Sequence, residues 1–253
     1  MTIEVHTHEL DCDLDELRRD ARRAIERWDW RRGAYGHALS LPAARQLHPY
    51  RRYSYQNHPC ADLLGACPGF ACIFDGLACE KLSFRLLRRA PNSAYGWHRD
   101  DWKGPCVARF QVPIFSDESA LLVLTDYEDV RRISARGGPP PDARWLAEFA
   151  DAHAGHVRCF RLDPGKLHYF DTTRVHTLIN PGGEERITLS FDLLANPWLM
   201  ARFPEIRSEV GEWPGPGPPR PGRSRQLVGR GMGWSHGLRN RARHWLRNGI
   251  SEA

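Results

Sequence analysis

Residues 174–194 read RVHTLINPGGEERITLSFDLL, and this stretch decides the fold that the sequence predicts. Two runs rich in β-branched and aliphatic residues, Arg174–Ile179 and Arg186–Leu194, lie on either side of the turn sequence NPGG at 180–183. Such runs around Asn, Pro and Gly are typical of antiparallel strands joined by a turn. We therefore expect the two strands to pair with each other through this turn.

Further runs of the same kind precede this stretch and are separated by Gly, Pro, Asp and Asn. They are Leu82–Leu87, Gly96–Arg99, Ala108–Phe115, Ala120–Thr125, His156–Leu162 and Leu167–Asp171. Eight short strands in all fit two antiparallel sheets that face each other. The sequence therefore predicts a mainly β protein with a double-stranded β-helix core, also called a jelly-roll or cupin-like core, and flanking helices.

Helical patterns flank this core. Residues 14–28 place apolar side chains three and four positions apart, which predicts an amphipathic helix, and Ala143–His153 is expected to form a short helix. Phe70–Ile73 is interpreted as either a strand or a buried loop. We expect three regions: an N-terminal helical region that packs on the core (1–45), the β-helix domain (46–204), and a Pro/Gly/Arg-rich linker with a basic C-terminal helix (205–253).

The net charge of +5, from 36 basic and 31 acidic residues among 253, is unevenly distributed. Residues 205–253 contain nine arginines and four glutamates, which accounts for all of it. The neutral body argues against a nucleic-acid-binding domain. The basic helix expected at 235–248 can contact an anionic membrane or an acidic partner, or it can fold back on the barrel.

Two further features bear on location. No stretch approaches 18 uninterrupted apolar residues, and the N-terminus lacks a basic segment followed by an apolar run, so we expect a cytoplasmic protein. The seven cysteines include no CxxC pair and are expected to be reduced, mostly buried thiols.

His98 and Asp100 suggest a metal site. Residues two apart on a strand project to the same face, so the imidazole and the carboxylate are expected to lie together. Taken alone, an HxD pair is a weak signal, because it occurs by chance in many chains and is more often a surface pair. His176, on a later strand, can supply a third ligand, and two histidines with one carboxylate leave open positions, as in non-haem Fe(II) oxygenases. His168, eight residues earlier, is the competing histidine and is expected to pack in the pocket.

Arg186 lies ten residues after His176. An inward arginine there can bind the distal carboxylate of 2-oxoglutarate, because its planar guanidinium presents two parallel donors. The alternative is a surface ion pair with Glu184 or Glu185.

Three motifs carry a family resemblance: HRD at 98–100, RFQVPI at 109–114 and FDTTRVHTLINPGGEERITLSFD at 170–192. They resemble the aspartyl/asparaginyl β-hydroxylase family of Fe(II)/2-oxoglutarate-dependent dioxygenases, including its proline-hydroxylase-like bacterial members. The resemblance spans roughly Leu82–Trp198 and implies a jelly-roll core. It implies that His98, Asp100 and His176 bind the iron and that Arg186, Arg109 and Arg85 contact the cosubstrate. For Arg85, binding of a substrate carboxylate or a plain ion pair stays open as an alternative. Gln111 stands where the family pattern has histidine.

The activity implied is hydroxylation of an unactivated C–H bond with Fe(II), 2-oxoglutarate and O2, releasing succinate and CO2. The substrate implied is a small molecule, an amino acid or an amino-acid-derived metabolite. Asp100 favours hydroxylation over halogenation, because a halide needs the position that the carboxylate occupies. Two alternatives stay open: a cupin-type metal-dependent isomerase or hydrolase without 2-oxoglutarate, and a non-catalytic jelly-roll binding module that acts through its basic tail.

Overall fold

The structure is a computed structural model that describes residues 4–28, 31–33, 36–40, 61–100, 106–126, 148–149, 151–208 and 210. The chain divides into two compact units, Met1–Trp213 and Pro214–Ala253. The second unit, with the expected basic helix, lies outside the described residues, and so does most of the expected helix at Ala143–His153. The first unit contains the two sheets and the helices reported below.

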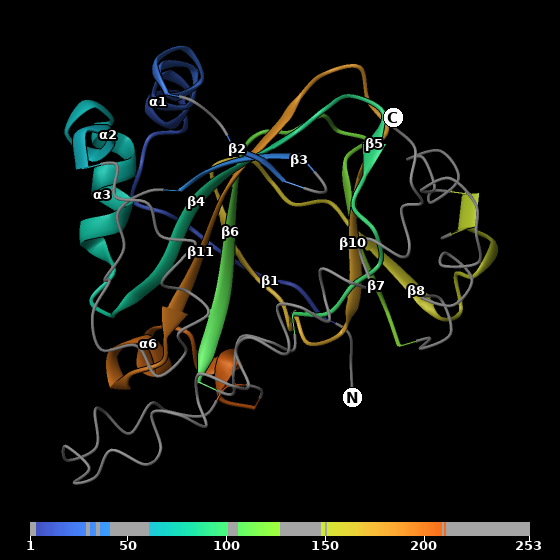
Figure 1. The fold of residues 1–253 in the computed structure, drawn as a ribbon. Coiled ribbons are helices and arrows are strands. Elements are labelled where there is room, and N and C mark those ends of the chain that lie inside the picture. Colours follow the sequence, from blue (N-terminus) through green and yellow to red (C-terminus); the bar gives the residue numbers. More distant parts are fainter. Residues whose placement is uncertain are drawn as a thin grey trace, which may run out of the picture. The chain divides into compact units, whose positions relative to one another are not determined.

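Two antiparallel sheets form the core (Figure 1). The larger contains β1 (His6–His8), β2 (Arg31–Gly33), β3 (Gly36–Ser40), β4 (Lys81–Arg89), β6 (Val107–Phe115), β9 (Leu167–Tyr169) and β11 (Arg186–Leu194). The smaller contains β5 (Ser93–Ala94), β7 (Leu121–Thr125), β8 (Val157–Phe160) and β10 (Val175–Asn180). The strand orders are β1-β9-β6-β11-β4-β3-β2 and β5-β10-β7-β8. This is the predicted mainly β fold with a jelly-roll core and flanking helices.

The expected pairing of the two strands around the turn at 180–183 is wrong. β10 pairs with β5 and β7, whereas β11 pairs with β4 and β6. The turn therefore carries the chain from one sheet to the other. The physical reason is burial: every residue of β11 is buried, so this strand needs a central place with neighbours of its own nine-residue length, which β4 and β6 provide.

Most predicted strands are confirmed with shifted ends, and one is wrong. Gly96–Arg99 does not form a strand; it makes one isolated bridge, between His98 and His176. The short strands β1, β2, β3 and β5 escaped prediction because two to five residues carry too little periodic pattern.

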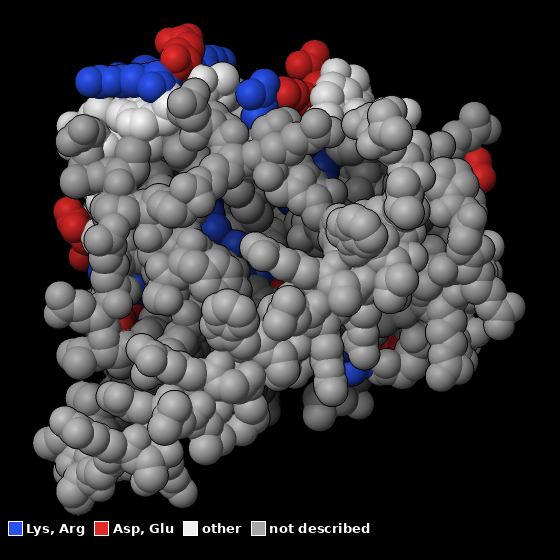
Figure 2. All heavy atoms as spheres, in the orientation of Figure 1, with Lys and Arg blue, Asp and Glu red and all other residues white. Residues whose placement is uncertain are grey.

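Helices in the described part of the chain include α1 (Leu14–Arg27), α2 (Ala61–Ala66), α3 (Pro68–Gly76) and α6 (Pro197–Arg202), and a 3₁₀ turn follows at Pro204–Ser208. The first confirms the predicted amphipathic helix and is capped by Asp13, whose side chain accepts a hydrogen bond from the amide of Asp15 at 3.0 Å. Phe70–Ile73 is neither strand nor loop, because it lies within α3. Figure 2 shows basic and acidic side chains together on the surface at the place of α1.

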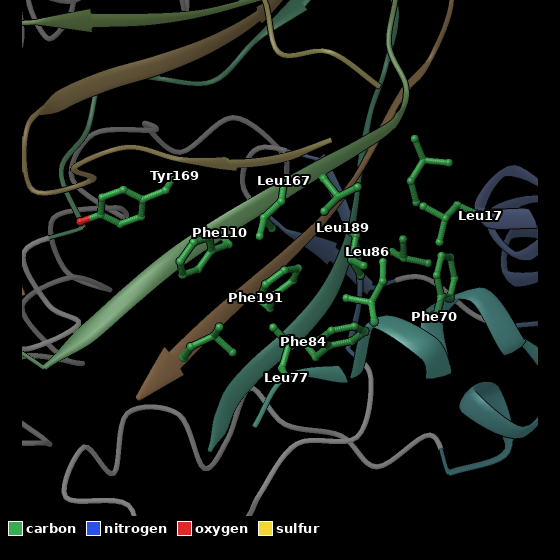
Figure 3. Close-up of a cluster of buried hydrophobic side chains, with 14 of the residues drawn as sticks. Leu17, Phe70, Leu77, Phe84, Leu86, Phe110, Leu167, Tyr169, Leu189 and Phe191 are labelled. Atoms are coloured by element: carbon green, nitrogen blue, oxygen red, sulfur yellow. The ribbon is translucent and has the colours of Figure 1, made fainter. Parts of the chain in front are cut away.

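The larger sheet has one apolar face, which the helices cover. Phe84, Phe110 and Phe191 stack across neighbouring strands, with ring centroids 5.4 Å and 6.0 Å apart (Figure 3). Leu17 of α1 and Phe70 of α3 belong to the same buried cluster. Ile206 and Val210 also belong to it, so the segment just after residue 204 is part of the core rather than of the basic tail.

The opposite face of this sheet, called here the inner face, is polar. Side chains alternate along each strand, and the register sets the polar residues opposite one another: Asp192 faces Arg109 and Ser83, Ser190 faces Gln111 and Arg85, and Arg186 faces Arg89. Figure 1 shows the smaller sheet on the side away from the helices, so a polar face is directed into the interior of the jelly roll.

Two expectations concern the chain as a whole. The six described cysteines are free thiols, but "mostly buried" is wrong: Cys67 is buried, while Cys72 and Cys159 are exposed. Within the described ranges, none of the helices combines the length and apolar character needed to cross a membrane.

Asp20 of α1 joins α1 to α3. Its buried carboxylate accepts hydrogen bonds from the amides of Gly69 and Phe70 at 2.7 and 3.1 Å. Cys67, the N-cap residue of α3, makes no side-chain hydrogen bond to these amides. Burial raises the pKa of Asp20, and the two amide donors oppose that rise. This side chain therefore supplies the cap that the helix's own N-cap residue lacks.

Replacing Asp20 by Ala is expected to lower the free energy of unfolding by about 2–4 kcal/mol, since two buried amides lose their acceptor. Urea unfolding followed by circular dichroism measures the change. Glu26→Ala, at an exposed position of α1, is the control and should cost no more than about 0.5 kcal/mol. Equal losses in the two variants would contradict a capping role for Asp20.

Candidate metal centre

The structure brings together the three predicted metal ligands. His98 and Asp100 lie between β5 and β6, and His176 lies on β10. One donor atom from each falls within 4.8 Å of the others, and within the described part of the chain no other such group of His, Cys, Asp and Glu occurs. Nε2 of His98 lies 4.0 Å from Asp100 Oδ1, and Nε2 of His176 lies 3.9 Å from Asp100 Oδ2. These spacings allow one ion to bind all three.

Backbone hydrogen bonds hold the three ligands in place. The amide of His98 donates to the carbonyl of His176 at 3.0 Å, and the amide of His176 donates to the carbonyl of His98 at 2.9 Å. The amide of Asp100 donates to the carbonyl of Thr172 at 2.8 Å. Gly96–Arg99 is not a strand, but this single bridge still brings His98 next to His176.

Both imidazoles present Nε2 to the group. Nδ1 of His98 lies 2.9 Å from the carbonyl oxygen of Gly96, and Nδ1 of His176 lies 2.9 Å from that of Arg174. A carbonyl only accepts, so Nδ1 carries the proton and Nε2 keeps its lone pair. Burial, reinforced by the neighbouring His98, lowers the pKa of His176 to about 3, so this ring is neutral at pH 7, as a metal ligand must be.

Arg109 fixes the carboxylate ligand. Its Nη1 donates to Oδ2 of Asp100, while Nε and Nη2 donate to Oδ1 and Oδ2 of Asp192 at 2.6 and 2.9 Å. Asp192 is fully buried; it also accepts a hydrogen bond from Ser83 at 2.9 Å and lies 3.7 Å from Arg85. Holding Oδ2 of Asp100 leaves Oδ1 for a metal. Arg109 therefore acts on the ligand as a positioning residue.

This placement bears on two sequence-based expectations. Arg109 and Arg85 were expected to contact the cosubstrate, and the structure places both guanidinium groups beside Asp192. Contact with 2-oxoglutarate stays a prediction for both. Sequence reasoning missed Asp192, although the two-residue period counted from Arg186 places it on the same face.

Arg186 has the character of an anion site. It exposes 3 % of its surface, and among the described residues its Nε and Nη1 have no hydrogen-bond partner. The expected alternative, an ion pair with a neighbouring glutamate, does not form, since Glu185 pairs with Arg88 at 2.8 Å. Burial, reinforced by Arg89, lowers the pKa of Arg186 to about 10, which still leaves it charged at pH 7. A buried cation without an acceptor is costly unless an anion binds it.

Further polar atoms of the inner face lack partners in the described part of the chain. They are Oγ of Ser190 and Oε1 of Gln111, which face each other across β11 and β6. Buried polar atoms are nearly always hydrogen-bonded in proteins. The inner face therefore offers both charge and hydrogen bonds to a polar ligand.

Arg89 was missed by sequence reasoning. It faces Arg186 across β4 and β11, and its guanidinium carbon lies 4.7 Å from the centre of the Tyr95 ring. That ring lies 4.4 Å, centroid to centroid, from the ring of His98. The two-residue period counted from Arg85 would have placed Arg89 on the inner face.

His168 lies outside the metal group. Its Nδ1 contacts Oγ1 of Thr7 at 3.1 Å and its Nε2 contacts the carbonyl oxygen of Asp163 at 3.0 Å. Burial lowers the pKa of this imidazole. Both ring nitrogens are engaged, and His168 does not join the group of His98, Asp100 and His176.

The donor set fits a divalent first-row metal such as Fe(II). Two neutral imidazoles and one carboxylate supply three ligands, which leaves positions for exogenous ligands. Arg186 lies on the face that carries Arg109, and its guanidinium presents two parallel donors that suit a carboxylate.

No family model and no curated protein matches the sequence. Solved structures are similar at low identity. HygX from Streptomyces hygroscopicus, with nickel and 2-oxoglutarate bound, is 14 % identical over 76 % of this chain and 83 % of that chain, with a TM-score of 0.46. The α-ketoglutarate-dependent carbocyclase SnoK from nogalamycin biosynthesis is 13 % identical over 76 % and 79 %, with a TM-score of 0.44. A Pseudomonas putida prolyl-4-hydroxylase is 14 % identical over 76 % and 94 %, with a TM-score of 0.43. At this level of similarity, function has to be inferred from the side chains of the site.

Replacing Asp192 by Asn is expected to weaken metal binding by about 10–100-fold, because Arg109 loses the partner that aims it at Asp100. Anaerobic titration with Co(II), followed by the visible absorption of the bound ion, measures the affinity and reports the ligand geometry. Glu185→Gln, which breaks the Arg88 pair, is the control and should bind Co(II) as the wild type does. Arg109→Lys tests the same link without loss of charge. Wild-type affinity and spectrum in folded Asp192→Asn protein would contradict the positioning role.

Proposed function

We propose that the protein is an Fe(II)/2-oxoglutarate-dependent oxygenase that hydroxylates an unactivated C–H bond of an amino acid or amino-acid-derived metabolite, releasing succinate and CO2. One observation carries the proposal: an open group of two histidines and one aspartate lies in the same interior as a buried arginine without a partner among the described residues. In a structural metal site the protein's own ligands fill all the coordination positions, so a buried arginine to bind a further anion would not be needed.

His98, Asp100 and His176 would hold the iron through Nε2, Oδ1 and Nε2. When bound, Fe(II) supplies the activation of O2 coupled to oxidative decarboxylation of 2-oxoglutarate. The chain's own residues bind and orient the reactants. Arg186 binds the distal carboxylate of 2-oxoglutarate, and the hydroxyl of Ser190, four residues along the same face of β11, is placed to donate a hydrogen bond to the bound anion.

The burial of the site favours such chemistry. Arg109, Asp192 and Asp100 are all buried, so their charges act on one another with little screening by water. A ligand that fills the inner face excludes water from the metal, which protects reactive species from side reactions.

Two alternatives give different results in the same assays. A cupin-type isomerase or hydrolase would not need Arg186 or 2-oxoglutarate. A non-catalytic module would act through the tail, for which we propose contact with an anionic membrane or an acidic partner. Deleting residues 214–253 separates the second case, since the cut falls beyond the core residues Ile206 and Val210.

Arg186→Gln is expected to weaken 2-oxoglutarate binding by about 100-fold, because two charge-assisted hydrogen bonds to the carboxylate are lost. Anaerobic titration of the Fe(II)-loaded protein, followed by its visible absorption, measures the affinity. Arg88→Gln removes an equal charge from the other face of the sheet and is expected to leave the affinity unchanged. Unaltered 2-oxoglutarate affinity in Arg186→Gln would favour the isomerase or hydrolase.

Reconstitution tests the activity itself. Protein incubated with Fe(II), 2-oxoglutarate, O2 and a panel of amino acids and their derivatives is expected to release succinate and to add one oxygen atom to one compound, as read by mass spectrometry. His98→Ala and Asp100→Ala are expected to abolish both signals, whereas the chain that ends at Trp213 should keep succinate release. Activity retained in the ligand variants would show that other residues bind the metal.

A further inference from the structure

Arg89 and Arg186 are directly opposite each other on β4 and β11. Side chains at opposite positions of an antiparallel pair have Cβ atoms about 5 Å apart, and like charges there are destabilising. In the described ranges no carboxylate pairs with either guanidinium, although Glu185 pairs with the adjacent Arg88 on the other face. Two neighbouring cations without a carboxylate partner repel each other, and bound anions would relieve this repulsion.

The two guanidinium groups have different surroundings. Arg186 is buried, and its charge helps to lower the pKa of His168 on β9, two strands from β11. Arg89 lies over the ring of Tyr95, which follows β5 of the smaller sheet. The two cations thus have different neighbours, which favours two anion positions over one shared position.

Tyr95 places Arg89 close to the metal ligands. The amide of Tyr95 donates to the carbonyl of Leu178 at 2.8 Å, and the hydroxyl of Thr177 donates to the carbonyl of Tyr95. The Tyr95 ring contacts both the Arg89 guanidinium and the His98 ring. A guanidinium that stacks by its face keeps its N–H edge free for a carboxylate.

The charges of the described inner face point the same way. Asp192 and Asp100 are neutralised by Arg109, with Arg85 beside Asp192, so Arg186 and Arg89 are left as uncompensated cations. 2-Oxoglutarate carries two carboxylates, one for the metal and one for Arg186. Among the described residues Arg89 then has no carboxylate as a counter-charge, and its guanidinium has two parallel donors to offer.

We propose that Arg89 binds a free carboxylate of the organic substrate. This inference rests on the proposed function and narrows it: the substrate is an anion whose carboxylate is not tied up as an amide or an ester. The carboxylate would sit beside Tyr95, and the rest of the molecule would extend toward the metal past His98. Arg89 is then a specificity-determining residue separate from the arginine that holds the cosubstrate.

The test uses the full chain loaded with Zn(II), which binds without redox chemistry, and has two arms. In the first, 2-oxoglutarate is titrated by calorimetry into wild type, Arg89→Gln, Arg186→Gln and Arg88→Gln. In the second, ¹³C-labelled acetate is titrated at saturating 2-oxoglutarate and constant ionic strength. Acetate is a small carboxylate probe, and acetamide, which has the same shape and no charge, is the control. Line broadening in the carbon spectrum measures binding.

We expect acetate, but not acetamide, to bind wild type saturably, and Arg89→Gln to weaken acetate binding by about tenfold or more. 2-Oxoglutarate affinity should stay at the wild-type value in Arg89→Gln and Arg88→Gln and fall in Arg186→Gln. Arg89→Lys, which keeps the charge without the fork, should bind acetate more tightly than Arg89→Gln, and serves if the glutamine variant does not fold.

Three results would overturn the inference: no saturable acetate binding to wild type, acetate binding indifferent to Arg89→Gln, or a loss of 2-oxoglutarate affinity in Arg89→Gln as large as in Arg186→Gln. The last would mean that both arginines hold one carboxylate. Wild-type protein that fails to bind 2-oxoglutarate at all would refute the proposed function instead. The two failures are therefore read from different titrations.

Discussion

The site depends on one buried ionic link, Arg109 between Asp192 and Asp100. Asp192 belongs to the fully buried central strand β11, so the link ties the chain segment that carries His98 and Asp100 to the middle of the larger sheet. Buried ion pairs repay their desolvation only when nearly every donor and acceptor is satisfied. Ser83 and Arg85 complete the set around Asp192, and removing a single member of such a network leaves a charge uncompensated, at a cost of about 3–5 kcal/mol.

The same alternation that builds the apolar core builds the polar interior. On β11, Leu189 and Phe191 belong to the apolar cluster under the helices, while Thr188, Ser190 and Asp192, which alternate with them, turn toward the smaller sheet. Unsatisfied buried groups such as the Arg186 guanidinium are destabilising in the free protein. A polar face of this kind lowers the stability of the free protein, and a bound ligand can restore that stability. This pattern is expected of a functional site.

Periodicity and turn residues were enough to predict the jelly roll, because long strands such as β6 and β11 carry their own signal. That His98, Asp100 and His176 lie together was also predictable, since two-residue spacing and the position of His176 limited the choice. Strand partners were not. Whether β10 pairs with β11 depends on which neighbours can cover a fully buried strand, and that is decided by β4 and β6, some 70 to 110 residues away. For the same reason the pairing of Arg109 with Asp192, which are 83 residues apart in the sequence, could not be predicted from local sequence patterns.

The unexpected crossing between the sheets has a consequence for the chemistry. His176 lies in the smaller sheet and Arg186 in the larger, yet only ten residues of chain join them. The segment that follows β10 is held to Ala90, just beyond β4, because the side-chain amide of Asn180 donates to the carbonyls of Ala90 and Glu184 at 3.0 and 2.9 Å. Each sheet thus carries one end of the proposed cosubstrate site, and this short connection limits how far the two ends can move apart. A hairpin, as the sequence alone suggested, would have placed both residues in one sheet, and the metal would then have had no second wall opposite it.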